Sequence, residues 1–192
     1  ILNAAHPSTF TREMKFNERQ RAKSNYIHQL VAEDAVELLT RNNCEYLLDE
    51  IFKDLRSDLL SEELRAQYQR IWQRDGAIEG MLQYYRSMPQ IAPQLAPKIV
   101  PQSTLVNDIS NDKPNTITAL EDITLPNIRI NVPTLVLWGE DDQAFVIENL
   151  NDLDEYVCDL TIKRFSQTSH WLQHEKPDEV NAEISKFISK IE

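Results

Sequence analysis

The hydrophobic pattern of the sequence changes near residue 133, and this change limits the fold more than any other feature. Across 10–88, apolar residues recur at spacings of three and four, which is the period of amphipathic helices. The run PTLVLWG at 133–139 is instead continuously apolar, as expected of a strand buried on both faces of a parallel sheet. We therefore expect an α/β chain in which a helical block accompanies a parallel sheet.

Strand and helix patterns alternate through the last third of the chain. ENLNDLDEYV at 148–157 predicts a helix, and LTIKRFS at 160–166 predicts a second strand. Pro177 opens a final helix that has its apolar residues on one face. The opening residues 1–4 predict one more strand, so about three strands of a parallel sheet are expected.

Most of the nine prolines fall within 89–132, together with the polar stretch NDISNDKPN. Proline interrupts helices and central strands. A stretch of this composition predicts a long surface connection between the helical block and the strands that follow.

Charge and cysteine content exclude several classes of partner. The chain has 20 basic and 31 acidic residues and a formal net charge of −11 at pH 7, which repels phosphate backbones and anionic lipids. No run approaches the ~20 apolar residues of a membrane span, and no signal-peptide pattern opens the sequence. Cys44 and Cys158 are isolated and predict neither a disulfide nor a zinc site. We expect a cytoplasmic protein that binds neither nucleic acid nor membranes.

Two loops that follow predicted strands carry the residues that could act in catalysis. In open α/β sheets, functional side chains lie at the carboxyl ends of the strands. Asp142 comes three residues after Gly139, and His170 follows the next strand in SQTSHW. A carboxylate that orients an imidazole makes a general base. Asp142 is preferred as the acid by its spacing from Gly139, although Glu140 and Asp141 are alternatives.

The other three histidines have simpler interpretations. We expect His6 and His174 to orient loops and His28 to lie on the surface of the helical block.

The chain resembles one branch of a known fold family. PTLVLWGEDDQAF, followed by LDEYVCDLTIKRFSQTSHWLQHEKPDEVNAEISKFI, is similar to the C-terminal third of α/β-hydrolase enzymes of the epoxide hydrolase and dehalogenase branch. ILNAAHP resembles the Asn-x-Pro-His-Pro segment of that branch, with Ala5 where proline is usual, and Ser169 stands where glycine is more frequent. The resemblance implies the C-terminal part of an α/β-hydrolase parallel sheet with an inserted helical cap. The implied divisions are a core strand and loop at 1–9, the cap at 10–105 and the C-terminal core at 106–192.

Two tyrosines of the implied cap match positions that face the active site in epoxide hydrolases. SNYIHQLVAEDAVELL resembles the first cap helix of those enzymes, and MLQYYRSM resembles a second cap segment. By this resemblance, Tyr26 and Tyr85 donate protons to the epoxide oxygen. Both also lie on apolar stripes, so packed core residues are the alternative. A dehalogenase commonly uses His-Trp or Trp donors in the cap, whereas Ile27 and His28 follow Tyr26 here, which favours the epoxide hydrolase.

The sequence lacks the strained turn that carries the nucleophile in this fold. Neither Gly-x-Ser-x-Gly nor Asp-x-Gly-Gly occurs, and the chain opens on ILNAAHP without Met. We therefore expect a fragment whose nucleophile, Asp or Ser, comes from the N-terminal half of the fold on another segment or chain.

The resemblance then implies a hydrolase of the epoxide hydrolase type. It would form a covalent alkyl-enzyme ester that His170-activated water cleaves, acting on a small apolar organic substrate without a metal or organic cofactor. A haloacid or haloalkane dehalogenase, a serine esterase and a catalytically incomplete fragment are the alternatives.

Overall fold

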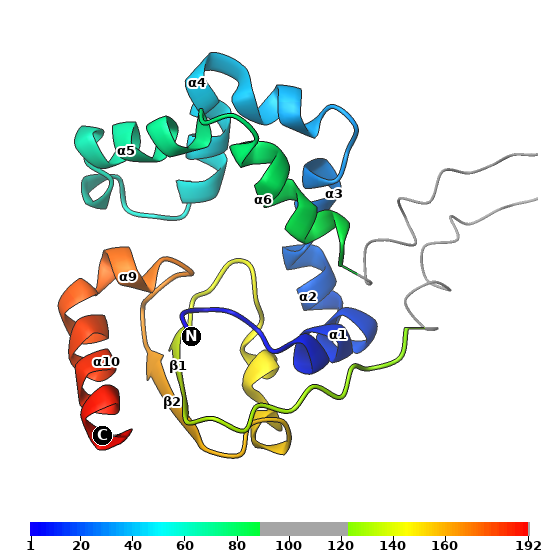
Figure 1. The fold of residues 1–192 in the computed structure, drawn as a ribbon, viewed down its shortest axis with the longest axis vertical. Coiled ribbons are helices and arrows are strands. Elements are labelled where there is room, and N and C mark those ends of the chain that lie inside the picture. The colour runs from blue at the N-terminus through cyan, green and yellow to red at the C-terminus, as the bar shows by residue number, and fades with distance from the viewer. Residues whose placement is uncertain (89–122, 192) are drawn as a thin grey trace, which may run out of the picture.

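The computed structural model describes residues 1–88 and 123–191 (Figure 1). The predicted boundary between cap and core at residue 105 lies outside the described residues, as does most of the proline-containing connection. The divisions at 1–9, 10–105 and 106–192 stay predictions. Within the described ranges, no helix combines the length and the apolar character that crossing a membrane requires.

The sheet has the parallel pairing that the sequence predicts. β1 (Thr134–Gly139) and β2 (Leu160–Phe165) pair in parallel along their full lengths. The opening residues 1–4 lie on the other edge of β1, but there they form only an isolated parallel bridge from Leu2 to Leu137. The predicted third strand is therefore present as a single bridge.

β1 is buried on both faces, as its continuous apolar run predicts. Leu135 and Leu137 pack against α10 (Pro177–Ile191), which is the predicted final helix. Val136 and Trp138 pack on the opposite face, against the segment that joins the two strands. All six residues of β1 are buried, so this strand is the centre of the core.

The helix predicted at 148–157 is wrong. This segment forms two short 3₁₀ turns, η2 (Ile147–Leu150) and η3 (Leu153–Glu155). Asp152 separates them with a left-handed φ of 56°, and the Asn149 side chain donates to the backbone carbonyl three residues before it. Short polar side chains that bond to nearby backbone compete with helix formation, which explains the interruption.

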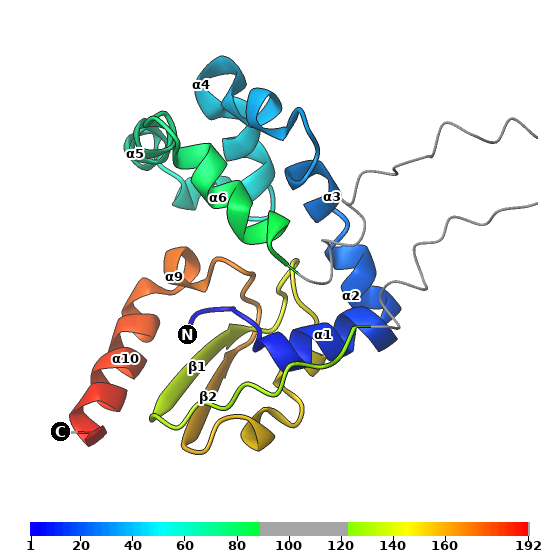
Figure 2. The ribbon, with the colours of Figure 1, turned by 45° about the vertical axis from the view of Figure 1, so that its right-hand side comes forward.

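The remaining helices surround the ends of the strands. In chain order they are α1 (Pro7–Phe16), α2 (Glu18–Lys23), α3 (Ile27–Leu30), α4 (Ala35–Phe52), η1 (Ser57–Leu59), α5 (Glu62–Trp72), α6 (Ala77–Arg86) and α9 (Leu172–Glu175). Gly76 has a left-handed φ of 72° and is the N-cap of α6, whereas α5 ends earlier, at Trp72. Figures 1 and 2 show α3 to α6 as a layer above the sheet, and α10 along one side of the sheet.

The layer of helices has its own apolar core. α4, α5 and α6 pack around one cluster, which includes Leu39, Leu48, Trp72, Ile78 and Leu82. α4 is interrupted near its middle, where three consecutive residues after Arg41 have positive φ. The cluster is separate from those that flank β1, and some of its members, including Leu39 and Ile78, also line a cavity.

Candidate active site

Asp142 lies in the loop that follows β1 and is almost completely buried. One carboxylate oxygen, Oδ1, accepts hydrogen bonds from the backbone N–H groups of Ala144 at 2.6 Å and Phe145 at 2.8 Å. These bonds form a turn closed by the side chain, which short acidic residues favour after a strand. They fix the carboxylate and leave its second oxygen, Oδ2, directed at His170.

His170 and Asp142 form a hydrogen-bonded pair. The distance from His170 Nδ1 to Asp142 Oδ2 is 2.9 Å, and the side-chain exposures are 28% for the imidazole and 1% for the carboxylate. A carboxylate beside Nδ1 favours the tautomer in which Nδ1 carries the proton, which leaves Nε2 as the basic nitrogen. The structure therefore brings together the two residues that the sequence proposed as acid and base, and their catalytic role stays a prediction.

The two alternative acids lie elsewhere. Glu140 is exposed and pairs with Arg164 at 2.9 Å. Asp141 is also exposed, and its backbone N–H donates to the carbonyl of Thr168. Among these three carboxylates, Asp142 is the one that is hydrogen-bonded to His170, so the geometry favours it.

A close approach of two backbones brings the two loops together. A Cβ atom placed on Gly139 would overlap the carbonyl oxygen of Ser169 and would lie 2.5 Å from that of Thr168. Only glycine fits there. The last residue of β1 therefore touches the residue that precedes His170.

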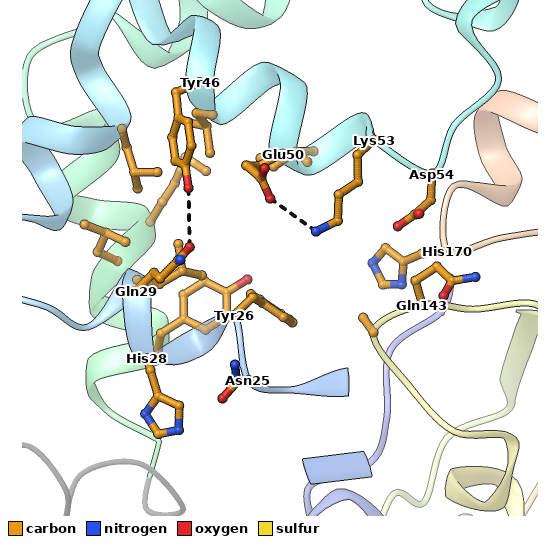
Figure 3. Close-up of a pocket in the computed structure, with 18 of the residues that line it drawn as sticks. Asn25, Tyr26, His28, Gln29, Tyr46, Glu50, Lys53, Asp54, Gln143 and His170 are labelled. Carbon is orange, nitrogen blue, oxygen red and sulfur yellow. Dashed lines mark hydrogen bonds and ion pairs between the residues drawn. The ribbon is translucent and has the colours of Figure 1, made fainter. Parts of the chain in front are cut away.

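The imidazole opens onto a cavity of about 710 Å³ between the helical layer and the sheet. Its walls come from α2 to α4, from α6 and from the two loops of the sheet. In Figure 3, His170 reaches into the cavity from the sheet side, with Lys53 and Asp54 above it and Tyr26 on the facing wall. The apolar part of the lining includes Leu30, Leu38, Leu39, Leu47, Ile51, Ile78, Met81 and Leu82.

Tyr26 and Tyr85 both line this cavity. Tyr26 precedes α3, Tyr85 lies in the last turn of α6, and the ring centroids are 6.3 Å apart in an edge-to-face arrangement. Tyr85 also packs on the cluster that contains Phe10 and Ile27. The structure thus places both tyrosines together in the cavity that His170 lines. Tyr85 also packs against apolar side chains, as the alternative interpretation of a core residue predicts. Tyr84 is 66% exposed.

The environment of the two phenols keeps them protonated. Burial raises the pKa of Tyr26 far above its usual value, and Tyr85 and the Asp142 carboxylate add to the rise. Burial also raises the pKa of Tyr85, and its contact with Tyr26 opposes part of that rise. Protonated phenols can donate to an oxygen on which negative charge develops.

The other histidines have contacts outside the Asp142–His170 pair. His6 accepts a hydrogen bond from the backbone N–H of Ser8 and caps α1. His174 Nε2 lies 2.9 Å from the hydroxyl of Tyr68 on α5. His28 is exposed and lines the cavity. Within the described ranges, no three His, Cys, Asp or Glu side chains cluster as a metal site would require.

Sequence reasoning missed several residues that shape the cavity. Glu50 and Lys53 form an ion pair at 3.2 Å along its edge, next to Asp54. Trp171 lines the cavity beside His170, and its indole N–H donates to the carbonyl of Ile51 at 3.0 Å. No sequence signal distinguishes these charges from an ordinary solvated helix face, because their position depends on how α4 lies over the sheet.

Comparisons with known proteins find relatives among epoxide hydrolases. No family model matches the chain. A segment of 61 residues, 32% of the chain, is 38% identical to Epoxide hydrolase 1 of Caenorhabditis elegans and covers 15% of it. A segment of 71 residues, 35% of the chain, is 38% identical to Epoxide hydrolase 4 of Mus musculus and covers 19% of it.

Solved structures match across almost the whole chain. An epoxide hydrolase from Bacillus megaterium, crystallised with an inhibitor, has a TM-score of 0.72 and 27% sequence identity, covering 96% of this chain and 58% of that one. A structure from a group of novel epoxide hydrolases of the α/β-hydrolase superfamily, found in hot-environment metagenomes, has a TM-score of 0.67 and 32% identity, covering 96% and 56%. The chain therefore spans little more than half the length of these solved relatives.

Proposed function

Because this chain is homologous to epoxide hydrolases and has the fold of the C-terminal part of an α/β-hydrolase, we propose that it carries the base and the proton donors of an epoxide hydrolase active site. The observation that carries the proposal is the Asp142–His170 pair, which opens onto a cavity lined by Tyr26 and Tyr85. In this proposal a further segment, outside residues 1–192, supplies the nucleophile, an aspartate.

The first step opens the ring. The aspartate carboxylate attacks one epoxide carbon, the carbon–oxygen bond breaks, and the ring oxygen develops alkoxide charge. Tyr26 and Tyr85 hydrogen-bond this oxygen, and one of them donates its proton to it. Burial raises the pKa of both phenols, so each is protonated at neutral pH and has a proton to donate. The product of the step is an alkyl-enzyme ester.

The second step cleaves the ester. Nε2 of His170 takes a proton from water, and the hydroxide attacks the ester carbonyl. The imidazolium that forms is stabilised by the carboxylate of Asp142 at 2.9 Å. The leaving alkoxide takes the proton of the new carboxyl group, so the diol leaves and the aspartate returns to its carboxylate form. The proton on His170 replaces the one that the tyrosine gave up during ring opening.

The lining of the cavity supports a small apolar substrate. Leucine and isoleucine side chains of α4 and α6 form the wall away from His170, where an apolar substituent on the epoxide gains from burial. No metal or organic cofactor takes part in the proposed steps.

The contact of Trp171 disfavours a dehalogenase of the kind that holds halide with a tryptophan donor. Among the described residues, Trp171 is the tryptophan that lines the cavity. Its indole N–H is already bonded to the carbonyl of Ile51. The two phenols fit an alkoxide better than a halide because they can transfer a proton to it.

The test is a hydrolysis panel of epoxides, haloalkanes, haloacids and short esters, with a protein that contains this chain together with its nucleophile. We expect diol formation from epoxides. His170→Ala should stop turnover after ring opening, so that intact-mass measurement detects an adduct with the mass of one epoxide. Hydrolysis of esters alone, or full turnover by His170→Ala, contradicts the proposal.

A variant pair tests the proton donors. Tyr85→Phe should slow adduct formation by about 10- to 100-fold, because one phenol remains. The neighbouring Tyr84→Phe makes the same change on an exposed side chain and should leave the rate unchanged. Equal rates for the two variants remove Tyr85 from the mechanism.

A further inference from the structure

We propose that Asn3 is a positioning residue, whose side-chain amide holds the Asp142 loop and the His170 loop at the spacing at which the acid and the base meet. The proposal deepens the proposed function and rests on it for its kinetic readout. Its spectroscopic readout depends only on the Asp142–His170 hydrogen bond. The two proposals can therefore fail separately.

The Asn3 amide spans the gap between the two loops. Its Oδ1 accepts from the backbone N–H of Gly139 at 2.7 Å, and its Nδ2 donates to the carbonyl oxygen of Ser169 at 2.9 Å. Gly139 ends β1 three residues before Asp142, and Ser169 directly precedes His170. One side chain thus links both loops close to the two residues that must meet.

The backbone of Asn3 fixes the direction of this amide. The residue is 2% exposed, and its own N–H donates to the carbonyl of Leu137 at 3.0 Å. Its φ is 34°, a left-handed value that asparagine and glycine tolerate better than other residues. Asparagine therefore satisfies two needs at once, an unusual backbone angle and an amide with one acceptor and one donor.

The other supports of Ser169 come from a different direction. Glu175 of α9 accepts from the backbone N–H of Ser169 at 2.9 Å and from its hydroxyl. These bonds tie the loop to α9 and leave its distance from β1 open. Backbone bonds from Glu140 and Asp141 join the loops elsewhere, whereas the carbonyl of Ser169 has Asn3 as its side-chain donor.

The first test replaces Asn3 with glycine, which keeps the left-handed angle without strain and removes only the amide. The protein tested contains this chain and its nucleophile. We expect the NMR resonance of the hydrogen-bonded Nδ1 proton of His170 to broaden or move upfield as the bond to Asp142 lengthens. We also expect kcat to fall by about 10- to 100-fold with KM little changed, the size of effect that a misplacement near 1 Å produces.

The second test, Asn3→Asp, gives a pH signature that a general loss of stability does not produce. The introduced carboxyl keeps an acceptor for Gly139, but it can donate to the Ser169 carbonyl only when protonated. Burial favours the protonated form. We therefore expect near wild-type kcat and His170 resonance at low pH, and loss of both as the pH rises through the pKa of the carboxyl. This adds an ionisation that the wild type lacks.

Asn17→Asp is the matched control. Asn17 also accepts from a backbone N–H, that of Arg19 at 3.0 Å, and donates to an oxygen, Oε2 of Glu13 at 2.9 Å. It caps α2, away from the hydrogen bonds that join the Asp142 and His170 loops. We expect this variant to keep the wild-type resonance and pH profile even if its melting temperature falls.

The outcomes separate clearly. A folded Asn3→Gly protein with the wild-type Nδ1 resonance and kcat overturns the proposal. If Asn3→Gly does not fold, Asn3→Asp decides alone, and a pH profile that overlays that of the wild type overturns it. A protein that hydrolyses other substrates leaves the Asn3 proposal open to the spectroscopic test, which then confirms or refutes it.

Discussion

At the scale of single residues, Asp142 combines three interactions in one buried carboxylate. Two backbone N–H groups hold Oδ1, and Oδ2 meets Nδ1 of His170. A carboxylate can only accept hydrogen bonds, so the proton between the two side chains must sit on Nδ1. This determines which nitrogen of His170 remains free to act as a base.

Asp142→Asn should therefore stop base catalysis while leaving the fold intact. The new amide keeps its oxygen toward Ala144 and Phe145 and turns its NH₂ group toward His170, which puts the imidazole proton on Nε2. We expect the ester-cleavage rate to fall by about 10⁴-fold, as in a protease triad with this change. Single-turnover kinetics measure it. Asp141→Asn, next to it and exposed, should leave the rate within error of wild type, and a similar loss in both variants contradicts the assignment.

The pKa values of the Tyr26 and Tyr85 phenols set the expected alkaline limit of activity. A tyrosine donates a proton only below its pKa, so ring opening is supported at lower pH and lost as the pH rises through the pKa values. Burial raises both pKa values above the ordinary value near 10. We expect the rate of adduct formation to remain constant up to about pH 10 and to decline only above it. A decline centred below about pH 9, in a protein that circular dichroism shows to be folded, contradicts this prediction.

At the scale of elements, the close spacing of β1 and the loop after β2 depends on the glycine at position 139, which has no side chain. The Cβ atom of Gly139→Ala would overlap the carbonyl oxygens of Ser169 and Thr168. Both oxygens belong to backbone and cannot rotate away. We expect Gly139→Ala to lower the free energy of unfolding by about 1–3 kcal/mol and to reduce turnover, since the His170 loop must move.

Gly80→Ala is the control for that change. Gly80 lies inside α6, and an added Cβ would meet nothing within 4 Å. Alanine favours helix over glycine, so this variant should gain up to about 1 kcal/mol. Denaturant unfolding of the two variants measures both values. A neutral Gly139→Ala would mean that the two loops do not approach each other this closely.

Contacts between elements also hold the helical layer over the sheet. Trp171 donates to the carbonyl of Ile51, and its ring packs against Phe52 with centroids 4.7 Å apart. The hydroxyl of Tyr68 meets His174 one turn further on. The short helix α9 begins two residues after His170, so the segment that contains His170 also anchors the layer above it.

Gln20 of α2 also joins a helix to the sheet, because its side chain bonds to the loop that follows β1. It is completely buried, and its amide makes four hydrogen bonds, to Ser24, Ala144, Val146 and Asn149. Both N–H donors and both acceptor positions of the amide oxygen are therefore used. The loop that carries Asp142 is thereby fixed to α2, which leads into Tyr26.

At the scale of the whole molecule, the sheet leaves apolar surface uncovered. Side chains with exposures of 38% to 62% lie on it or next to it, namely Ile1, Leu2, Val132 and Ile162. Uncovered strands with apolar side chains promote association with other chains. We expect the 192-residue chain expressed alone to be insoluble, or to associate with a second polypeptide that covers this surface.

Sedimentation and light scattering of the expressed chain check this prediction. Co-expression with the segment that carries the nucleophile should restore solubility and activity together. A stable monomer of the chain alone, without aggregation at high concentration, contradicts it.

The sequence alone was enough to predict the parts of this fold that local pattern controls. The continuous apolar run of β1, the strand β2 and the amphipathic α10 could be predicted because burial on two faces, on one face or along one stripe leaves a distinct spacing of apolar residues. The proximity of Asp142 and His170 followed from the same spacing, since the carboxyl ends of adjacent parallel strands meet at one edge.

Tertiary structure decided what depends on residues distant in sequence. The side chain of Asn149 bonds to Gln20, a residue 129 positions away. The cavity exists because α4 and α6 pack on each other and leave the sheet side open, and Asn3 lies 166 positions from the Ser169 carbonyl that it holds. Hydrophobic spacing records which face of an element is buried, but not what it is buried against. The proximity of Asp142 and His170 could therefore be predicted from sequence, whereas the residues that hold the two loops in place could not.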